Sequence, residues 1–389
     1  MSGAAPLPRV LFVGRARIRF PLEQGLARRF EALSRELDWH QLGTRTGSSP
    51  PISSRFVLAR PFPIGPLEGL AYHLALPLRV RRELRRFRPD AVIVQGAQET
   101  ALVLLARQLS RVRAAVVLEL HGDWRAPTRL YGSRGRRLLD PLADHLARWA
   151  IRRADAVRTI TAYTTELARA EGVEPAAEFP AYMDLEAFTA RPVVPLPERP
   201  RALFVGVLER YKAFDVLAEA WRRVAESLPD PVLHVVGRGA LAPLAERLVA
   251  ELPGRVDWTP ALAADEVAAA LDAATVLVLP SRSEGMGRVI VEAGLRGRGV
   301  VASRVGGIPD IARDGQTGFL VPPGDPHVLA NVLVRVLSDR ALAQRLGVTA
   351  RKVSEGWLVS PEAYAARVRA LVDRASGPEW PGGSGPGPN

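Results

Sequence analysis

The sequence contains no cysteine and almost no lysine. The absence of cysteine excludes disulfide bridges and a thiolate nucleophile. Only Lys212 and Lys352 are lysine among the 53 basic residues, so nearly every positive charge is an arginine. The six histidines are scattered without metal-ligand spacing, and we expect no metal site.

Long apolar runs are also missing. No stretch approaches the roughly 18 consecutive apolar residues of a membrane span. Residues 1–8 are too short and too poor in apolar residues for a secretory leader, so we expect a cytoplasmic protein. With 389 residues, 47% of them apolar and 24% charged, the chain has the composition of a folded protein of about two domains.

The net charge of +12 is concentrated in residues 1–190, which account for +10. Such an excess favours an anionic partner, namely a nucleic acid, a membrane surface or an acidic acceptor. A general preference for arginine explains it equally well. The helix expected over residues 79–88 has Val80, Leu84 and Phe87 on one face and arginine on the rest. It is either an ordinary surface helix or a peripheral contact with an anionic membrane at the inner face.

Short apolar runs alternate with helical patterns through the whole chain. Strands are predicted over residues 10–13, 90–94, 114–120, 156–160, 202–205, 232–236, 275–279, 299–303 and 318–321. Helices are predicted over residues 22–37, 80–87, 99–109, 164–171, 215–227, 241–252, 265–272 and 288–296. This alternation predicts parallel sheets with helices on both faces.

Two α/β domains follow from this pattern, residues 1–188 and residues 189–360. Prolines near residues 186–200 indicate a stiff, extended linker between them. A helix over residues 361–376 is expected to pack back towards the N-terminal domain, and residues 377–389, rich in glycine and proline, to be disordered. Ligands of such sheets bind beyond the carboxyl ends of the strands, so we expect a site in a cleft between the domains.

The loop after residues 275–279 has the features of an anion site. Gly285 and Gly287 free the backbone at the start of a helix, where N–H groups and the helix dipole favour a phosphate. Glu284 lies in this loop, and Glu292 lies a little over one turn into the helix. Since carboxylates accept hydrogen bonds from hydroxyls, we expect sugar at Glu284 and ribose at Glu292. The alternative is a helix-start carboxylate at Glu284 and a solvated helix position at Glu292.

The spacing Glu284-x7-Glu292 resembles the E-x7-E motif of retaining glycosyltransferases of family 4, which have the GT-B fold. Residues 302–310, with Gly306-Gly307 and Pro309-Asp310, resemble that family's GG-x-P-E stretch with Asp in place of Glu. Residues 314–321 resemble its NG-x-TG-x-LV stretch. The resemblance is strong over residues 180–345 and weaker over residues 1–180, where His121-Gly122 and residues 154–156 are similar.

The resemblance implies an α/β protein of two Rossmann-like domains that face each other across a cleft. It implies a retaining, metal-independent hexosyl- or N-acetylhexosaminyltransferase, with a UDP- or GDP-sugar as donor substrate and no cofactor. The acceptor would be a hydroxyl of a glycan, a lipid or a small molecule, as in polysaccharide biosynthesis. The C-terminal domain would bind the donor, and the N-terminal domain the acceptor.

The resemblance also implies roles for individual residues. Lys212 matches the lysine that binds the donor diphosphate, and His121 matches a histidine that approaches the transferred sugar; both are candidate catalytic residues together with Glu284. Further donor contacts are implied for Glu292, Arg210, Gly285, Met286, Gly287, Arg288, Gly206, Arg238 and Leu262. Acceptor contacts are implied for Gly14, Arg15, Arg17 and Asp123.

One position departs from the family pattern. Val207 stands where the family usually has arginine, so either Arg210 replaces that cation or diphosphate binding is weaker. An inactive GT-B-like nucleotide-binding scaffold is therefore one alternative, and a nucleotide-sugar epimerase of the same fold is another. A non-enzymatic nucleic-acid-binding protein is a third, disfavoured by the aromatic content of 6% and by the lack of nucleic-acid-reading motifs.

Overall fold

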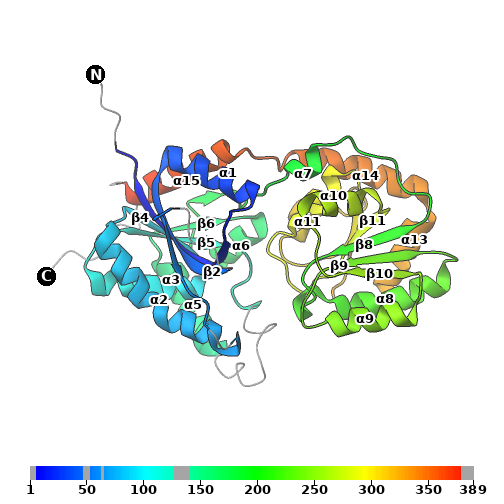
Figure 1. Cartoon of the computed structure of the whole chain (residues 1–389), viewed down its shortest axis with the longest axis horizontal. Helices are drawn as coiled ribbons and strands as arrows, with labels where there is room; N and C mark the ends of the chain where they lie inside the picture. Colours follow the sequence, from blue (N-terminus) through cyan, green and yellow to red (C-terminus); the bar gives the residue numbers. More distant parts are fainter. Residues whose placement is uncertain (1–5, 47–52, 63–64, 127–139, 378–389) are drawn as a thin grey trace. The chain divides into compact units, whose positions relative to one another are not determined.

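The computed structural model describes residues 6–46, 53–62, 65–126 and 140–377. The chain divides into two compact units, each built on a parallel sheet (Figure 1). The first unit consists of Met1–Met183 and Val359–Asn389, and the second of Asp184–Leu358. The first boundary thus lies five residues before the predicted one at 188/189.

In the described residues the first unit has a seven-stranded parallel sheet in the order β3-β2-β1-β4-β5-β6-β7. Its strands are β1 (Arg9–Arg19), β2 (Asp38–Thr46), β3 (Phe56–Ala59), β4 (Ala91–Gln95), β5 (Ala115–Leu120), β6 (Ala156–Thr159) and β7 (Ala177–Glu178). The sequence analysis missed β2, β3 and the two-residue β7. In β2, polar residues are interspersed among the apolar ones, which hides the strand pattern.

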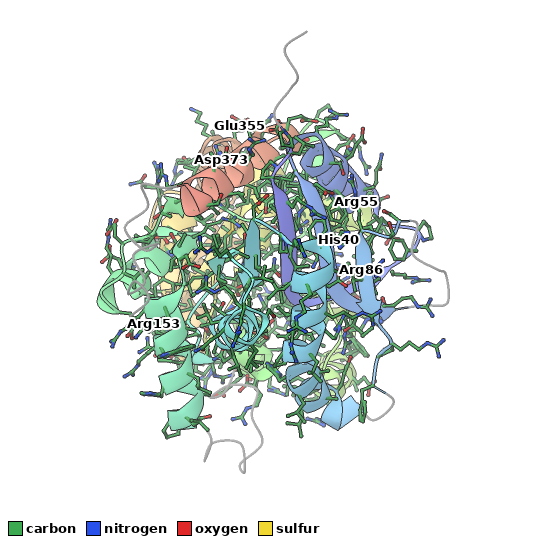
Figure 2. The ribbon with its side chains drawn as sticks, turned by 90° about the vertical axis from the view of Figure 1, so that its left-hand side faces the viewer. His40, Arg55, Arg86, Arg153, Glu355 and Asp373 are labelled. Carbon is green, nitrogen blue, oxygen red and sulfur yellow. The ribbon has the colours of Figure 1, made fainter. Side chains whose placement is uncertain are left out.

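Helices cover both faces of this sheet. On one face lie α1 (Gln24–Glu36) and α15 (Pro361–Ser376), and on the other α2 (Gly65–Phe87), α3 (Ala97–Ser110) and α5 (Asp140–Arg153). The helix α6 (Ala162–Ala170) follows β6. Figure 2 shows this unit from another side, with Asp373 marking α15 and Arg86 marking α2. Strand β1 contributes to the hydrophobic cores on both faces of the sheet. Val10 and Phe12 pack with α1, and Leu11 and Val13 pack with α2.

Strand β1 is longer than predicted. The prediction covers residues 10–13, but the strand continues to Arg19, with a register irregularity against β2 between Val13 and Arg17. In the extension Arg15, Arg17 and Arg19 are exposed while Ile18 is buried. This alternation has the period of two that a strand requires, so the predicted end of the strand is corrected.

In the described residues the second unit has a six-stranded parallel sheet in the order β10-β9-β8-β11-β12-β13. Its strands are β8 (Arg201–Val205), β9 (Val232–Val236), β10 (Val256–Thr259), β11 (Val276–Leu279), β12 (Gly299–Ser303) and β13 (Gly318–Val321). Its helices are α7 (Glu186–Thr189), the 3-10 turn η2 (Arg210–Lys212), α8 (Phe214–Ser227), α9 (Ala242–Glu251), α10 (Ala264–Asp272), α11 (Arg288–Leu295), α12 (Ile308–Ile311), α13 (Pro326–Ser338) and α14 (Arg340–Glu355).

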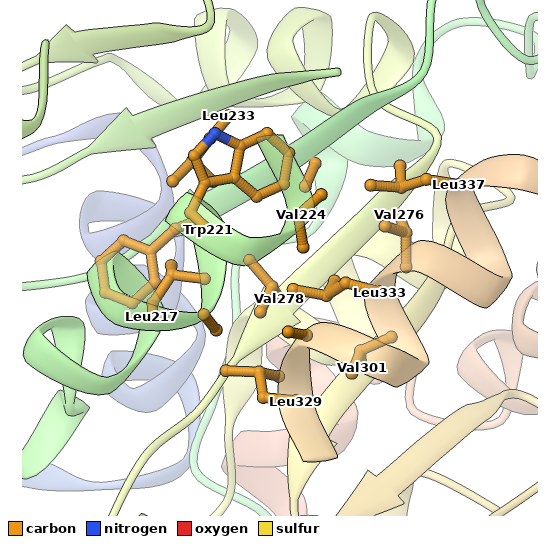
Figure 3. Close-up of a cluster of buried hydrophobic side chains, with 14 of the residues drawn as sticks. Leu217, Trp221, Val224, Leu233, Val276, Val278, Val301, Leu329, Leu333 and Leu337 are labelled. Carbon is orange, nitrogen blue, oxygen red and sulfur yellow. The ribbon is translucent and has the colours of Figure 1, made fainter. Parts of the chain in front are cut away.

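The largest core of this unit lies between the sheet and the helices α8 and α13 (Figure 3). Trp221 of α8 is completely buried there and donates its indole N–H to the carbonyl of Arg255 at 3.2 Å. Val278 of β11 and Leu333 of α13 belong to the same cluster. Strands buried on both faces explain the continuous apolar runs of this half of the sequence.

The proline-rich segment is bound to the second unit instead of forming a free linker. The buried Arg296 donates to the carbonyls of Arg191 at 2.7 Å and Pro192 at 2.8 Å. The equally buried Arg298 donates to the carbonyls of Val194 at 3.1 Å and Pro195 at 3.2 Å. Burial lowers the pKa of Arg298 to about 10. The guanidinium groups of these arginines thus provide hydrogen-bond donors for carbonyls of an extended segment that is not part of a β-sheet.

The C-terminal helix α15 packs on α1 within the first unit. Tyr364, Val368 and Leu371 are buried in the same core as β1, and Arg369 donates to the carbonyl of Glu36 at 3.3 Å. Of the tail expected to be disordered, 377–389, all but Gly377 lies outside the described residues.

We predict that Leu371→Ala lowers the free energy of unfolding by about 2–5 kcal/mol, because it leaves a cavity in the core beneath α15. Urea unfolding followed by circular dichroism measures this change. Arg367→Ala, at an exposed position of the same helix, is the matched control and changes stability by less than about 0.5 kcal/mol. Equal effects of the two substitutions would contradict this packing.

Candidate functional site

Lys212 and Glu284 form an ion pair at the carboxyl edge of the second sheet. Lys212 ends the turn η2 that follows β8, and Glu284 lies in the loop that follows β11. Because β8 and β11 are parallel neighbours, their following loops meet at one edge. Lys212 Nζ lies 2.7 Å from Glu284 Oε2, and Ser281 Oγ donates to the same oxygen at 3.1 Å. Only 12% of the lysine side chain and 13% of the glutamate side chain are exposed.

A second ion pair fixes these two loops to each other. The Arg282 guanidinium binds both oxygens of Asp215, at 2.8 and 2.7 Å, and donates to the carbonyl of Arg210 at 2.7 Å. The Arg282 backbone N–H donates to the carbonyl of Tyr211 at 2.7 Å. Burial acts to raise the pKa of Asp215, but the hydrogen bonds and charge of Arg282 outweigh it and lower the pKa. The sequence analysis missed Arg282 and Asp215.

Glycines hold neighbouring loops against the pair. Gly306, with φ of +54°, follows β12, and a Cβ there would overlap the carbonyl oxygen of Glu284. The next N–H, that of Gly307, donates to this oxygen at 3.1 Å. After β9, a Cβ on Gly237 would overlap the carbonyl oxygen of Gly206. The glycine pair therefore sets the position of the Glu284 backbone through close packing.

The helix α11 begins directly after the Glu284 loop. Gly287, with φ of +77°, is its N-terminal cap, and no side chain caps the helix. Arg288 is exposed, and its Nε lies 2.6 Å from Oε1 of the buried Glu292. Burial raises the pKa of Glu292, although the Arg288 charge opposes the shift. Gly285 is half-buried and Met286 is buried beside them.

In the described residues, no hydrogen bond or ion pair joins the side chains of Lys212 and Glu284 to the remaining residues predicted to bind the donor, Gly206, Arg210, Arg238 and Leu262. Gly206 lies against the Lys212 side chain. Arg210 and Arg238 have exposed side chains, and Leu262 is half-buried before α10. In the part of the chain that the structure describes, no ion pair or side-chain hydrogen bond involves the guanidinium of Arg210 or Arg238. Val207 is 44% exposed at the same edge.

His121 lies at the carboxyl end of β5 in the first unit. Its Nε2 is 3.3 Å from Oε2 of the buried Glu119, which is also paired with the buried Arg158. Arg158 in turn donates to the carbonyls of Phe179 at 3.0 Å and Pro180 at 2.8 Å. Burial acts to raise the pKa of Glu119, but the Arg158 charge and the His121 hydrogen bond hold it well below its usual value. The sequence analysis missed both Glu119 and Arg158, although each is a charge inside an apolar strand.

The predicted acceptor residues have partners of their own within the first unit. Gly14 is buried inside β1 beside Gln95. Arg15 lies over the ring of Tyr72 with its guanidinium carbon 5.7 Å from the ring centre. Arg17 pairs with Glu68 of α2. Asp123 accepts a hydrogen bond from Arg125 Nε at 2.8 Å.

Two family models match most of the chain. The model described as "Glycosyl transferase 4-like domain" matches residues 23–180, and the model described as "Glycosyl transferases group 1" matches residues 199–339. Together they cover all strands of the second sheet and all strands of the first sheet except β1.

Sequence relatives agree with these matches. The chain is 29% identical to the sulfoquinovosyl transferase of Arabidopsis thaliana over 78% of this chain and 60% of that protein. It is 42% identical to a D-inositol 3-phosphate glycosyltransferase of Thermobifida fusca over 37% of this chain and 36% of that protein. It is 29% identical to an alpha-D-kanosaminyltransferase of Streptomyces kanamyceticus over 70% of this chain and 74% of that protein. The matched part is thus less than two thirds of the first two relatives.

Solved structures establish the fold. A sucrose-phosphate synthase of Thermosynechococcus elongatus is similar with a TM-score of 0.75 and 22% identity, over 94% of this chain and 98% of that chain. The Anabaena protein HepE, solved in complex with UDP-glucose, has a TM-score of 0.67 and 18% identity, over 93% of this chain and 99% of that chain. The predicted GT-B fold with two Rossmann-like units is therefore confirmed.

We predict that Gly306→Ala displaces the Glu284 loop. Both Gly306 and Gly324 have positive φ, but a Cβ meets nothing within 4 Å at Gly324. Gly324→Ala should therefore lower the free energy of unfolding by about 1–2 kcal/mol, from the backbone conformation alone. Gly306→Ala should lower it by about 1–3 kcal/mol more, because the added Cβ also overlaps the Glu284 carbonyl oxygen. Urea unfolding of both variants measures the difference. Equal losses would show that the contact with Glu284 is unimportant.

We predict that Glu119→Gln destabilises the protein at neutral pH by about 3–5 kcal/mol, because Arg158 stays buried without its counter-charge. A depressed pKa stabilises the fold above the pKa of the unfolded carboxyl, about 4.3, and this contribution is lost as pH falls through the folded-state pKa. The difference between the native protein and the variant should therefore shrink in acid, as measured by urea unfolding at several pH values. Glu174→Gln, which breaks a surface pair with Arg169, is the control. A difference independent of pH would contradict the assignment.

Proposed function

Because the chain belongs to the group 1 glycosyl transferases, we propose that it transfers a sugar from a nucleotide diphosphate donor to a hydroxyl acceptor with retention of configuration. The observation that supports this most directly is the Lys212–Glu284 pair at the carboxyl edge of the second sheet. It places a cation and a hydrogen-bonding carboxylate side by side next to the uncapped start of α11. A phosphorylated sugar requires both kinds of partner.

In this proposal the second unit binds the donor. Lys212 and the first N–H groups of α11 support the negative charge that develops on the diphosphate as it leaves. Glu284 accepts hydrogen bonds from the hydroxyls of the transferred sugar, and Glu292 from those of the ribose. The donor would approach the backbone closely at four residues, Gly206, Gly285, Met286 and Gly287. The nucleotide would be surrounded by the side chains of Arg210, Arg238, Arg288 and Leu262.

The transfer exchanges one bond to the anomeric carbon for another. The bond from this carbon to the diphosphate oxygen breaks, and a bond to the acceptor oxygen forms on the same face of the sugar. The leaving phosphate oxygen accepts the proton of the acceptor hydroxyl, so no protein carboxylate acts as nucleophile. Lys212 and the α11 amides supply positive charge for the diphosphate, and the proposed reaction uses no metal ion or cofactor.

The relatives narrow the classes of substrate. Their names include sulfoquinovosyl and kanosaminyl transfer and an inositol phosphate substrate, and HepE was solved with UDP-glucose. We therefore favour a UDP- or GDP-hexose as donor, and a glycan, lipid or small molecule as acceptor. The exposed Arg15 of β1 favours an anionic acceptor in the first unit, and Arg17, which pairs with Glu68, lies two residues further along the strand. His121 and Asp123 follow β5 in the same unit and complete this group.

An inactive nucleotide-binding scaffold is the second candidate. It is favoured by the exposed Val207, where the family usually has arginine. Arg210 lies three residues further on, and its guanidinium has no ion-pair partner in the described residues, so it is available to replace the missing cation. The two candidates differ in outcome, because the scaffold binds a nucleotide without turnover.

We predict that Lys212→Ala lowers sugar transfer by about 100-fold or more, since it removes a cation from the leaving diphosphate. The only other lysine, Lys352, is exposed on α14 and provides the matched control. Lys352→Ala should keep full turnover. Release of nucleoside diphosphate in the presence of acceptor measures the rate, and nuclear magnetic resonance of the product reports the anomeric configuration.

Donor binding is tested separately by thermal unfolding with UDP, GDP or ADP. A nucleotide that binds only the folded protein raises the melting temperature by mass action, and Lys212→Ala should reduce this shift while Lys352→Ala does not. Shifts without any turnover would favour the scaffold. Full turnover of Lys212→Ala would overturn the donor site.

A further inference from the structure

The outer face of three helices in the first unit is unusually apolar. Of the fourteen large hydrophobic side chains exposed in the described residues, eight lie on α2, α3 and α5. These helices cover the same face of the first sheet, and α3 packs against both α2 and α5 (Figure 1). Single exposed apolar residues are common, but a concentration on one layer of helices indicates a contact surface.

On α2 the exposed side chains change from apolar to basic along the helix. Leu70, Leu74 and Leu78 are 55%, 70% and 68% exposed. The same four-residue spacing continues to the exposed Arg82 and Arg86. Residues four apart are neighbours on a helix, but each such step turns by about 40° around the axis. The row of side chains therefore winds around α2 from leucine to arginine, with Arg82 next to Leu78.

The neighbouring helices α3 and α5 also expose large apolar side chains. Leu105 and Leu109 are exposed on α3, and Leu142, Leu146 and Trp149 are exposed on α5. The spacing of four and three residues on α5 places the side chains on one side. Tryptophan is amphipathic and favours the boundary between water and hydrocarbon.

The exposed charged side chains on α2, α3 and α5 themselves are all basic, and the exposed Asp90 follows α2. No acidic side chain of α2, α3 or α5 is exposed in the described part of the chain. Besides Arg82 and Arg86, exposed arginines without an ion pair among the described residues are found on or directly after these helices: Arg85, Arg88, Arg111, Arg113 and Arg153. Figure 2 labels Arg86 and Arg153 at the surface of this unit. We call these leucines, Trp149 and arginines the leucine–arginine face.

We propose that the leucine–arginine face binds an anionic lipid bilayer. The arginines would contact lipid phosphates while the leucines and Trp149 enter the boundary of the hydrocarbon. A second copy of the chain fits this face poorly, because it would bring together two faces that both carry an excess of positive charge. The proposed contact is with the bilayer surface. Among the described residues, no helix is long and apolar enough to cross a bilayer.

The position of the face relates it to the predicted acceptor residues. Glu68 in the first part of α2 pairs with Arg17, and Gly69 lies next to the Arg15 side chain. The row of exposed leucines starts one residue later, at Leu70. Within the first unit, a bound membrane would therefore adjoin the edge of the sheet at which Arg15 and Arg17 lie. The membrane contact itself does not depend on the proposed transfer reaction.

Vesicle flotation with the full chain tests the proposal. The probes are phosphatidylcholine vesicles with and without phosphatidylglycerol. We expect binding to the anionic vesicles that weakens as salt is raised, because surface charge is screened. Arg82→Gln with Arg86→Gln should reduce partitioning about 30-fold. Leu74→Gln with Leu78→Gln should reduce it roughly tenfold or more.

The control is Arg345→Gln with Val348→Gln, which alters an exposed arginine and an exposed apolar residue on α14 of the second unit. It should bind vesicles like the native protein, and circular dichroism checks that each variant is folded. The proposal is overturned if the native protein binds neither kind of vesicle, as an acidic protein partner for this face would predict. It is equally overturned if both kinds bind alike, or if the two test variants bind as well as the control.

Discussion

The ion pair of Lys212 with Glu284 is the contact around which the second unit's carboxyl edge is organised. Two mostly buried opposite charges 2.7 Å apart are tolerated because each has the other as partner. Removing either would leave an uncompensated charge. In the proposed donor site, a diphosphate at Lys212 competes with Glu284 for the same cation. The proposed role of Glu284, accepting hydrogen bonds from the sugar of that donor, then uses the carboxylate that this competition releases.

The backbone around the pair is fixed before any ligand arrives. Arg282 and Asp215 clamp the turn with Lys212 to the loop with Glu284, and Gly306 brings the loop after β12 onto the Glu284 carbonyl. Catalysis by electrostatic support depends on charges that need little rearrangement during the reaction. The clamp and the glycine contacts provide that rigidity from positions that do not themselves face a substrate.

Sequence patterns predicted this edge well because loops after neighbouring parallel strands must meet. They placed Glu284 in the loop after β11 and predicted the start of α11 correctly, and they predicted most strands of the second sheet. They could not pair Arg282 with Asp215, since a bidentate contact depends on the detailed path of two loops. They also missed Glu119 and Arg158, which are direct partners across β5 and β6. Each is visible as a charge in an apolar strand, but strand order and register are needed to join them.

The excess of arginine has two physical explanations, internal contacts and a proposed external partner. In the second unit, Arg296 and Arg298 use several donors each to satisfy carbonyls of the proline-rich segment, and Arg282 binds a carboxylate with both branches. Lysine has one compact charge and no rigid fork, so it cannot replace these contacts. In the first unit, arginines such as Arg82 and Arg86 have no such partners in the described residues. Internal structure therefore accounts for the arginines of the linker and loops, and the proposed lipid contact accounts for those beside the exposed leucines.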